Sequence, residues 1–184
     1  MRVIVVEDNI LFCDYICNFL QNADYQTVKA YRLAQARQVI ARSVREDDIV
    51  LADLRLPDGE STALLEWMRV QGYTHPFIMM TNYEEIHTAV HAMKLGAEDY
   101  ILKPLLEDKL LPALKKIRMA ELLEDRKGLE KWTGRIIRGH AYPNGSYSEE
   151  IKQLYRQLGV AYARVVETVP DFALPKDPLE WHAT

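Results

Sequence analysis

The sequence predicts an α/β protein built on a five-stranded parallel sheet with helices on both faces. Short apolar runs alternate with longer segments of helical periodicity through the first 120 of the 184 residues. The loops between them hold only a few residues, as expected for successive strand–helix units. Polar residues also stand at the ends of several apolar runs. In a parallel sheet these ends meet at one edge, where a crevice can form.

Five segments are expected to form strands: Arg2–Val6, Thr27–Tyr31, Ile49–Asp53, Pro76–Thr81 and Tyr100–Lys103. The first run (RVIVV) and the third (IVLAD) are almost wholly apolar, which is typical of strands buried on both faces. Right-handed crossovers leave few arrangements, and we expect the flavodoxin-like strand order 2-1-3-4-5.

Helices are expected over residues 9–22, 33–44, 60–71 and 84–95, with a last one from Leu106. Gly96 is the C′ residue that should end the fourth. Pro112 lies early in the last helix, where a missing N–H costs less than it would further in.

The pattern changes near residue 118, so we divide the chain into a domain at 1–120, a helical extension or linker at 121–134, and an incomplete, irregular segment at 135–184. Ser148 resembles an N-cap, and Gly159 should stop the helix that follows it. Val160–Val166 fits either a strand or a second helix.

Composition limits the partners. The net charge is −4, and acidic residues slightly outnumber basic ones both before and after residue 118, so nucleic acid is an unlikely partner. No apolar stretch approaches 18 residues, so we expect no membrane span, and the strand-like N-terminus does not resemble a signal peptide. Cys13 and Cys17 are too few for a disulfide scaffold. We expect both to be buried apolar residues in a cytoplasmic protein.

The polar residues at the strand ends suggest a particular chemistry. Glu7 and Asp8 follow the first strand and Asp53 ends the third, which makes an all-oxygen site suited to Mg²⁺. Thr81 and Lys103 end the fourth and fifth strands and could balance the charge of a phosphoryl group. A carboxylate beside a bound metal can accept that group as an aspartyl-phosphate.

Residues 1–120 resemble the CheY-like receiver domain of two-component response regulators. The resemblance is carried by VVEDN (5–9), LADLRLPDG (51–59), MT (80–81) and GAEDYILKP (96–104). It implies that Asp53 is the phosphoacceptor and that Asp8, Asp53 and the backbone carbonyl of Arg55 bind Mg²⁺ directly. Glu7 would act largely through water, and Thr81 and Lys103 would contact the phosphoryl oxygens. The Lys103–Pro104 peptide is expected to be cis.

The resemblance also implies a switch. Phosphorylation would draw Thr81 inward and let Tyr100 turn into the vacated space, which re-forms the face of the fourth helix, fifth strand and fifth helix. The donor would be a histidine kinase or phosphotransfer protein, and a homodimer could form through that face. Such a domain is not an enzyme in the metabolic sense, because it catalyses only its own phosphorylation and dephosphorylation. Asn82 and Tyr83 are bulkier than the family's usual residues over the crevice.

The last third leaves two further readings open. Residues 148–168 can be written as a helix-turn-helix of a DNA-binding regulator, although Arg164 is the single arginine on its second helix. Residues 135–184 also resemble a late segment of polysaccharide deacetylases, with a loop, a helix and a barrel strand. The metal-binding motif of that family is absent upstream, so we expect no deacetylase activity from this fragment.

Overall fold

The computed structural model describes residues 1–43, 45, 47–83, 85–133, 139–141, 149–158, 160, 162–168 and 181–183. The chain forms two compact units, Met1–Leu114 and Lys115–Thr184. Helix α5 (Leu106–Thr133) contributes residues to both units.

The first unit is a doubly wound parallel sheet. Its strands are β1 (Arg2–Val6), β2 (Gln26–Ala30), β3 (Asp48–Asp53), β6 (Phe77–Thr81) and β7 (Asp99–Leu102), in the order β2-β1-β3-β6-β7. All neighbouring pairs are parallel. The predicted order 2-1-3-4-5 is therefore confirmed, and each predicted strand lies within one residue of its observed position.

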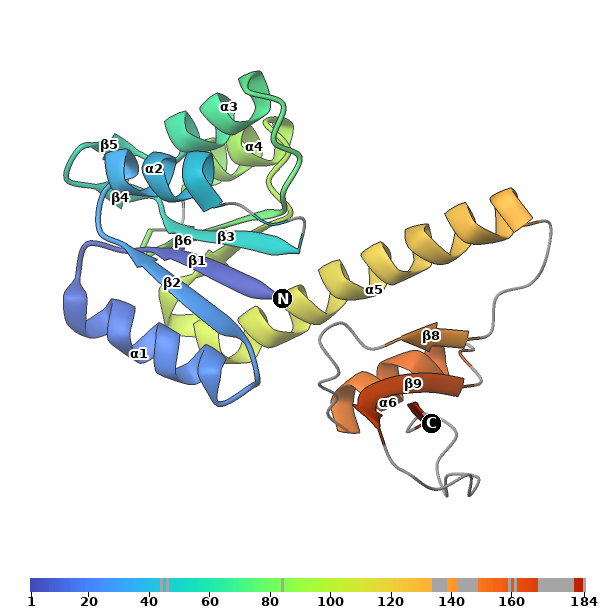
Figure 1. Ribbon diagram of the computed structural model, residues 1–184. Coiled ribbons are helices and arrows are strands. Elements are labelled where there is room, and N and C mark those ends of the chain that lie inside the picture. Colours follow the sequence, from blue (N-terminus) through green and yellow to red (C-terminus); the bar gives the residue numbers. More distant parts are fainter. Residues whose placement is uncertain are drawn as a thin grey trace. The chain divides into compact units, whose positions relative to one another are not determined.

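Helices cover both faces of this sheet. Figure 1 shows α2 (Leu33–Ser43), α3 (Thr62–Val70) and α4 (Ile86–Lys94) on one face, and α1 (Ile10–Gln21) with the start of α5 on the other. Asn9 caps α1 by accepting a hydrogen bond from the Phe12 N–H at 3.1 Å. Gly96 follows α4 with φ +88°, so the predicted C′ glycine is confirmed.

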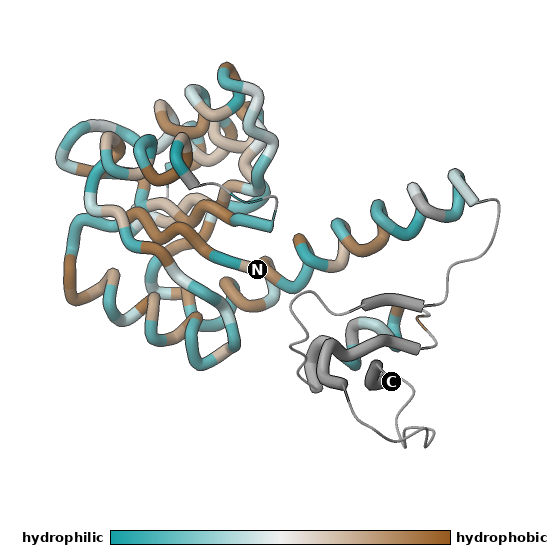
Figure 2. The backbone as a smooth tube through the Cα atoms, in the orientation of Figure 1, coloured by the Kyte–Doolittle hydropathy of each residue, from teal (hydrophilic) through white to brown (hydrophobic). Residues whose placement is uncertain are grey.

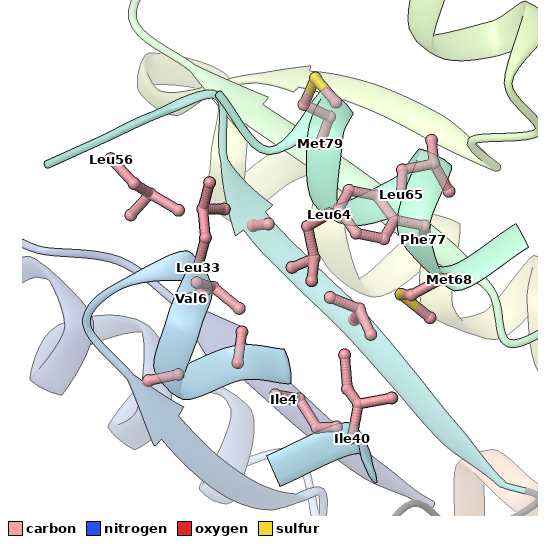
Figure 3. Close-up of a cluster of buried hydrophobic side chains, with 14 of the residues drawn as sticks. Ile4, Val6, Leu33, Ile40, Leu56, Leu64, Leu65, Met68, Phe77 and Met79 are labelled. Atoms are coloured by element: carbon pink, nitrogen blue, oxygen red, sulfur yellow. The ribbon is translucent and has the colours of Figure 1, made fainter. Parts of the chain in front are cut away.

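Alternate strand residues build two apolar layers. Figure 3 shows Ile4, Val6, Phe77 and Met79 on one sheet face with side chains from α2 and α3. In Figure 2 the strands of this sheet are mostly hydrophobic and the loops around them mostly hydrophilic. Cys13 and Cys17 are buried on α1 as free thiols, which confirms their expected burial.

A small hairpin follows β3. Strand β4 (Arg55–Leu56) pairs antiparallel with β5 (Gly59–Glu60). Gly59 has φ +138°, and a Cβ there would lie 3.1 Å from the Leu33 side chain. The glycine therefore allows the hairpin to approach the first turn of α2 closely.

The second unit contains the rest of α5, helix α6 (Glu149–Gln157) and a three-stranded parallel sheet in the order β10-β9-β8. These strands are β8 (Gly139–Ala141), β9 (Tyr162–Thr168) and β10 (Trp181–Ala183). The Arg126 guanidinium on α5 donates to the carbonyl of Leu158, just after α6. Ser148 and Gly159 lie outside the described residues.

The helix-turn-helix reading is wrong, because residues 162–168 form a strand rather than a recognition helix. β-branched residues and alternation favour the strand, and pairing with β8 and β10 on either side satisfies its backbone groups. Of the two forms left open for this segment, the strand is the correct one.

Candidate functional site

Three carboxylates converge at the carboxyl edge of the first sheet. Glu7 and Asp8 follow β1 and Asp53 ends the neighbouring β3, and ligand oxygens of all three lie within 4.8 Å of one another. Glu7 is buried and Asp53 is 8% exposed, whereas Asp8 is exposed. Three hard oxygen donors in this arrangement fit the ligand preference of Mg²⁺. They form the one such cluster of metal-binding side chains among the described residues.

Lys103 lies between two of these carboxylates. Its Nζ is 2.8 Å from Glu7 Oε2 and 2.8 Å from Asp53 Oδ2. Burial lowers the pKa of Lys103, but its hydrogen bonds and ion pairs with Asp53 and Glu7 outweigh that effect, and the net pKa is raised. Lys103 therefore stays charged, and it can hold one negative group in place until another negative group replaces it.

Glu7 is the least solvated of the three acids. Burial raises the pKa of Glu7 above its usual value, and Lys103 opposes that shift. Its Oε1 also accepts the Asn9 N–H at 3.2 Å, which ties the acid to the start of α1. Because the buried carboxylate depends on a cation beside it, this position favours a site that binds positive charge.

Phe12 is a site residue that the sequence analysis missed. Its ring centroid lies 5.0 Å from Lys103 Nζ, which is cation–π distance. Helical periodicity places Phe12 on α1 but does not show which side chain faces the lysine.

Thr81 and Tyr100 are linked through the backbone of Tyr83. The buried Thr81 Oγ1 accepts the Tyr83 N–H at 3.2 Å, and the Tyr100 hydroxyl donates to the Tyr83 carbonyl at 3.2 Å. Burial raises the pKa of Tyr100, so its hydroxyl remains a donor at neutral pH. The two predicted switch residues thus bind the two backbone groups of the same residue, the N–H and the carbonyl of Tyr83.

Asp58 and the Lys103–Pro104 peptide also follow strands at this edge of the sheet. Asp58 does not join the acidic cluster, because its carboxylate accepts the backbone N–H groups of Leu33 and Ala34 at the start of α2. The expected cis peptide at Lys103–Pro104 is wrong, since the described residues hold no cis peptide bond. Pro104 instead lies in the 3₁₀ turn η1 (Lys103–Leu105), where a trans proline has the φ that a helical turn requires.

The Arg55 side chain was also unforeseen, because only its carbonyl was expected to act. Its Nη2 lies 2.5 Å from Glu85 Oε1, and its guanidinium lies 4.6 Å from the centroid of the Tyr83 ring. No sequence signal pairs these residues, which are about 30 positions apart along the chain.

A doubly wound sheet with an acidic crevice and a lysine at its carboxyl edge defines a class of phosphoryl-accepting signalling domains. Residues 3–115 match the response regulator receiver domain family, and the chain belongs to that family. This is a signalling family rather than an enzyme family in the usual sense. The match ends at residue 115, so the deacetylase resemblance of residues 135–184 stays a prediction.

The relatives are transcriptional regulators. The chain is 32% identical over 118 residues to the transcriptional regulatory protein ZraR of Salmonella typhimurium, covering 62% of this chain and 25% of the relative. It is 30% identical over 129 residues to PhoP of Escherichia coli, covering 70% of this chain and 55% of PhoP. The chain thus spans about a quarter of the length of the ZraR relatives. These matches do not support the expectation that nucleic acid is an unlikely partner.

Solved structures show the same fold. A CheY-like receiver domain from Methanospirillum hungatei is 27% identical, with a TM-score of 0.61 over 67% of this chain and 97% of that one. The BeF3-activated receiver domain of RstA from Klebsiella pneumoniae is also 27% identical, with a TM-score of 0.54 over 62% of this chain and 98% of that one.

None of the helices in the described part of the chain has the length and hydrophobicity that a membrane span requires.

Proposed function

We propose that this chain is a phosphorylation switch in which Asp53 accepts a phosphoryl group. The observation that carries the proposal is the Asp53 carboxylate, which pairs with Lys103 at 2.8 Å and lies in one cluster with the acids Glu7 and Asp8. Receiver domains take phosphoryl groups from histidine kinases, so a histidine kinase or a phosphotransfer protein is the proposed donor. The two free thiols are compatible with a reducing cytoplasm, where we place the reaction.

The transfer is a direct displacement at phosphorus. An oxygen of Asp53 forms the new P–O bond while the bond from phosphorus to the donor breaks, and the leaving group keeps that electron pair. Glu7, Asp8, Asp53 and the backbone carbonyl of Arg55 would hold Mg²⁺, with Glu7 acting largely through water. When bound, the ion supplies positive charge to the phosphoryl oxygens.

Lys103 and Thr81 act on the transferred group. The Lys103 ammonium would leave its ion pair with Asp53 Oδ2 and contact a phosphoryl oxygen, so its charge is used both before and after transfer. The Thr81 hydroxyl would turn from Tyr83 to another phosphoryl oxygen. Tyr100 would then move into the space that Thr81 leaves, and this movement carries the signal to the surface.

The surface of α4, β7 and α5 is the proposed site of the signalled change and of a homodimer. Ile86, Val90 and Met93 are exposed on α4 at helical spacing, with exposed fractions of 77%, 48% and 49%. A second copy would cover these apolar side chains. Sedimentation of the chain with and without the phosphoryl analogue BeF3⁻ tests this, and a monomer in both states would exclude the dimer.

The output of the whole protein is a second proposal. The names of the relatives favour control of transcription, although residues 162–168 form a strand rather than a recognition helix. Binding of the full chain to duplex DNA, measured at two salt concentrations, would test a direct role, because phosphate contacts make such binding strongly salt-dependent.

Intact mass spectrometry after incubation with acetyl phosphate and Mg²⁺ tests the phosphoacceptor. We expect one phosphoryl adduct on the native chain and none on Asp53→Asn. Asp58→Asn is the matched control, because Asp58 lies in the hairpin that follows Asp53 but caps α2, and this variant should keep the adduct. An adduct at native level on Asp53→Asn would show that Asp53 is not the acceptor.

A further inference from the structure

The ammonium group of Lys103 has neighbours of two kinds. Its Nζ lies 2.8 Å from Glu7 Oε2 and 2.8 Å from Asp53 Oδ2, and it lies over the Phe12 ring at 5.0 Å from the centroid. The lysine side chain is 10% exposed. A phenyl ring attracts the cation but offers it no oxygen or nitrogen acceptor, so the N–H groups of the ammonium are left for the carboxylates.

The Phe12 ring is itself held in place by contacts with α1 and α5. The Phe12 N–H donates to the side chain of Asn9, the cap of α1, at 3.1 Å. Its ring stacks on the ring of Tyr15, with centroids 5.9 Å apart and planes 17° apart. The Tyr15 hydroxyl donates to the carboxylate of Glu107, in the first turn of α5. These contacts tie the ring to the segment that carries Lys103.

We propose that Phe12 is a positioning residue for phosphoryl transfer, whose ring directs the Lys103 ammonium toward the phosphoryl oxygens on Asp53. The inference rests on the phosphoryl-accepting function proposed above. A lysine side chain is long and flexible, and its ammonium is strongly hydrated. The ring restricts the ammonium before the phosphoryl group arrives. A donor oriented in advance stabilises the charge that develops during transfer without reorganisation.

The strength of the cation–π contact sets the size of the expected effect. Such contacts are weak at exposed sites and stronger where the cation is desolvated, and Lys103 is largely shielded from water. Loss of the ring should therefore slow phosphoryl transfer about 3- to 30-fold. The affinity for Mg²⁺ should change little, because the substitution leaves the three acids in place.

Substitutions on α1 separate the aromatic face from simple packing. Phe12→Leu and Phe12→Met keep an apolar side chain but lose the ring, and the second variant guards against misfolding of the first. Phe12→Tyr keeps the ring. Phe19→Leu is the matched control, because Phe19 is also half-buried and lies about two turns further along the same helix.

The test measures a rate and a spectroscopic signature on the full chain. The rate is the initial formation of the phosphoryl adduct from acetyl phosphate and Mg²⁺, followed by intact mass. The signature is the NMR signal of the Lys103 Cε protons in isotope-labelled lysine, assigned with Lys103→Arg. A cation over the face of a ring has its neighbouring protons shifted upfield by the ring current, so this signal reports the contact itself. Calorimetry gives the affinity for Mg²⁺.

We expect Phe12→Leu and Phe12→Met to lose the upfield shift and to be phosphorylated more slowly, whereas Phe12→Tyr and Phe19→Leu keep both the shift and the rate. A native rate without the ring, or an equal loss of rate in Phe12→Tyr or Phe19→Leu, would overturn the role of Phe12 and leave the proposed function intact. A loss of Mg²⁺ affinity that matches the loss of rate would also overturn it, because the ring would then hold the acids. No adduct on the native chain would refute the proposed function, and the role of Phe12 with it.

Discussion

Replacing Asp58 by alanine removes a helix cap supplied from another part of the chain. In the structure the Asp58 carboxylate accepts the Leu33 N–H at 2.8 Å and the Ala34 N–H at 2.9 Å. These are two of the four N–H groups that the first turn of α2 cannot satisfy within the helix. The carboxylate also lies at the positive end of the helix dipole.

The size of the effect follows from these contacts. Replacing a capping side chain by alanine costs about 0.5–2 kcal/mol. Two short bonds argue for the upper half of this range, but Asp58 is exposed, so we expect about 1–1.5 kcal/mol. For a domain of this size that loss corresponds to roughly 3–8 °C in Tm.

The pH dependence of stability provides an independent test of the Asp58 cap. Burial raises the pKa of Asp58, but the N–H groups of Ala34 and Leu33 outweigh it and hold the pKa below its usual value. A carboxyl with a depressed pKa in the folded state stabilises the protein above its unfolded pKa, and this contribution is lost as pH falls through the folded pKa. The difference in the free energy of unfolding between the native protein and Asp58→Ala should therefore become smaller below about pH 4.

Urea denaturation of native, Asp58→Asn and Asp58→Ala at pH 7 and pH 3 measures both effects. Asparagine keeps one acceptor oxygen, so Asp58→Asn should lie between the other two proteins. If Asp58→Ala unfolds at the native urea midpoint at pH 7, the two bonds contribute nothing and the reasoning fails.

Three further predictions concern the core and the site. Arg2→Met leaves the buried Asp48 carboxylate without its bidentate partner, whose two hydrogen bonds are 2.9 and 2.5 Å long. The free energy of unfolding in urea should fall by about 3 kcal/mol. The double variant Arg2→Met/Asp48→Leu should recover stability, and an unchanged stability of the single variant would contradict the prediction. Phe77→Ala should cost about 3–5 kcal/mol, because the ring is fully buried between the sheet and α3; a change below about 1 kcal/mol would show that the cavity collapses. Lys103→Ala should retain Mg²⁺ binding by calorimetry but lose the BeF3⁻-induced shift of Tyr100, and a normal shift would refute the role of the lysine.

The first sheet and its acidic edge are predictable from the sequence because they depend on local patterns. A strand buried on both faces needs an unbroken apolar run, as in Arg2–Val6 and Asp48–Asp53. Parallel strands bring their carboxyl ends to one edge, so the approach of Glu7, Asp8 and Asp53 follows once the strands are known.

Contacts between loops were decided only by the tertiary structure. Asp58 resembles one more acid of the site in sequence, yet the hairpin of β4 and β5 carries it to the start of α2. The pairing of Arg55 with Tyr83 depends on how two loops from different strands approach each other, and no periodicity records that approach. Pairing with neighbouring strands likewise resolved residues 162–168 as a strand, because the segment by itself suits either form.

The physical reason for this division is how far apart in the sequence the interacting residues lie. Burial and backbone hydrogen bonding act on every residue of a strand or helix and leave a repeating signature in the sequence. A cap, a cation–π contact or the isomer of one proline depends on a few atoms from distant segments, and only the folded chain places those atoms together. The sequence by itself thus determined the sheet and the chemistry at its edge, while the tertiary structure decided which side chains restrain that chemistry.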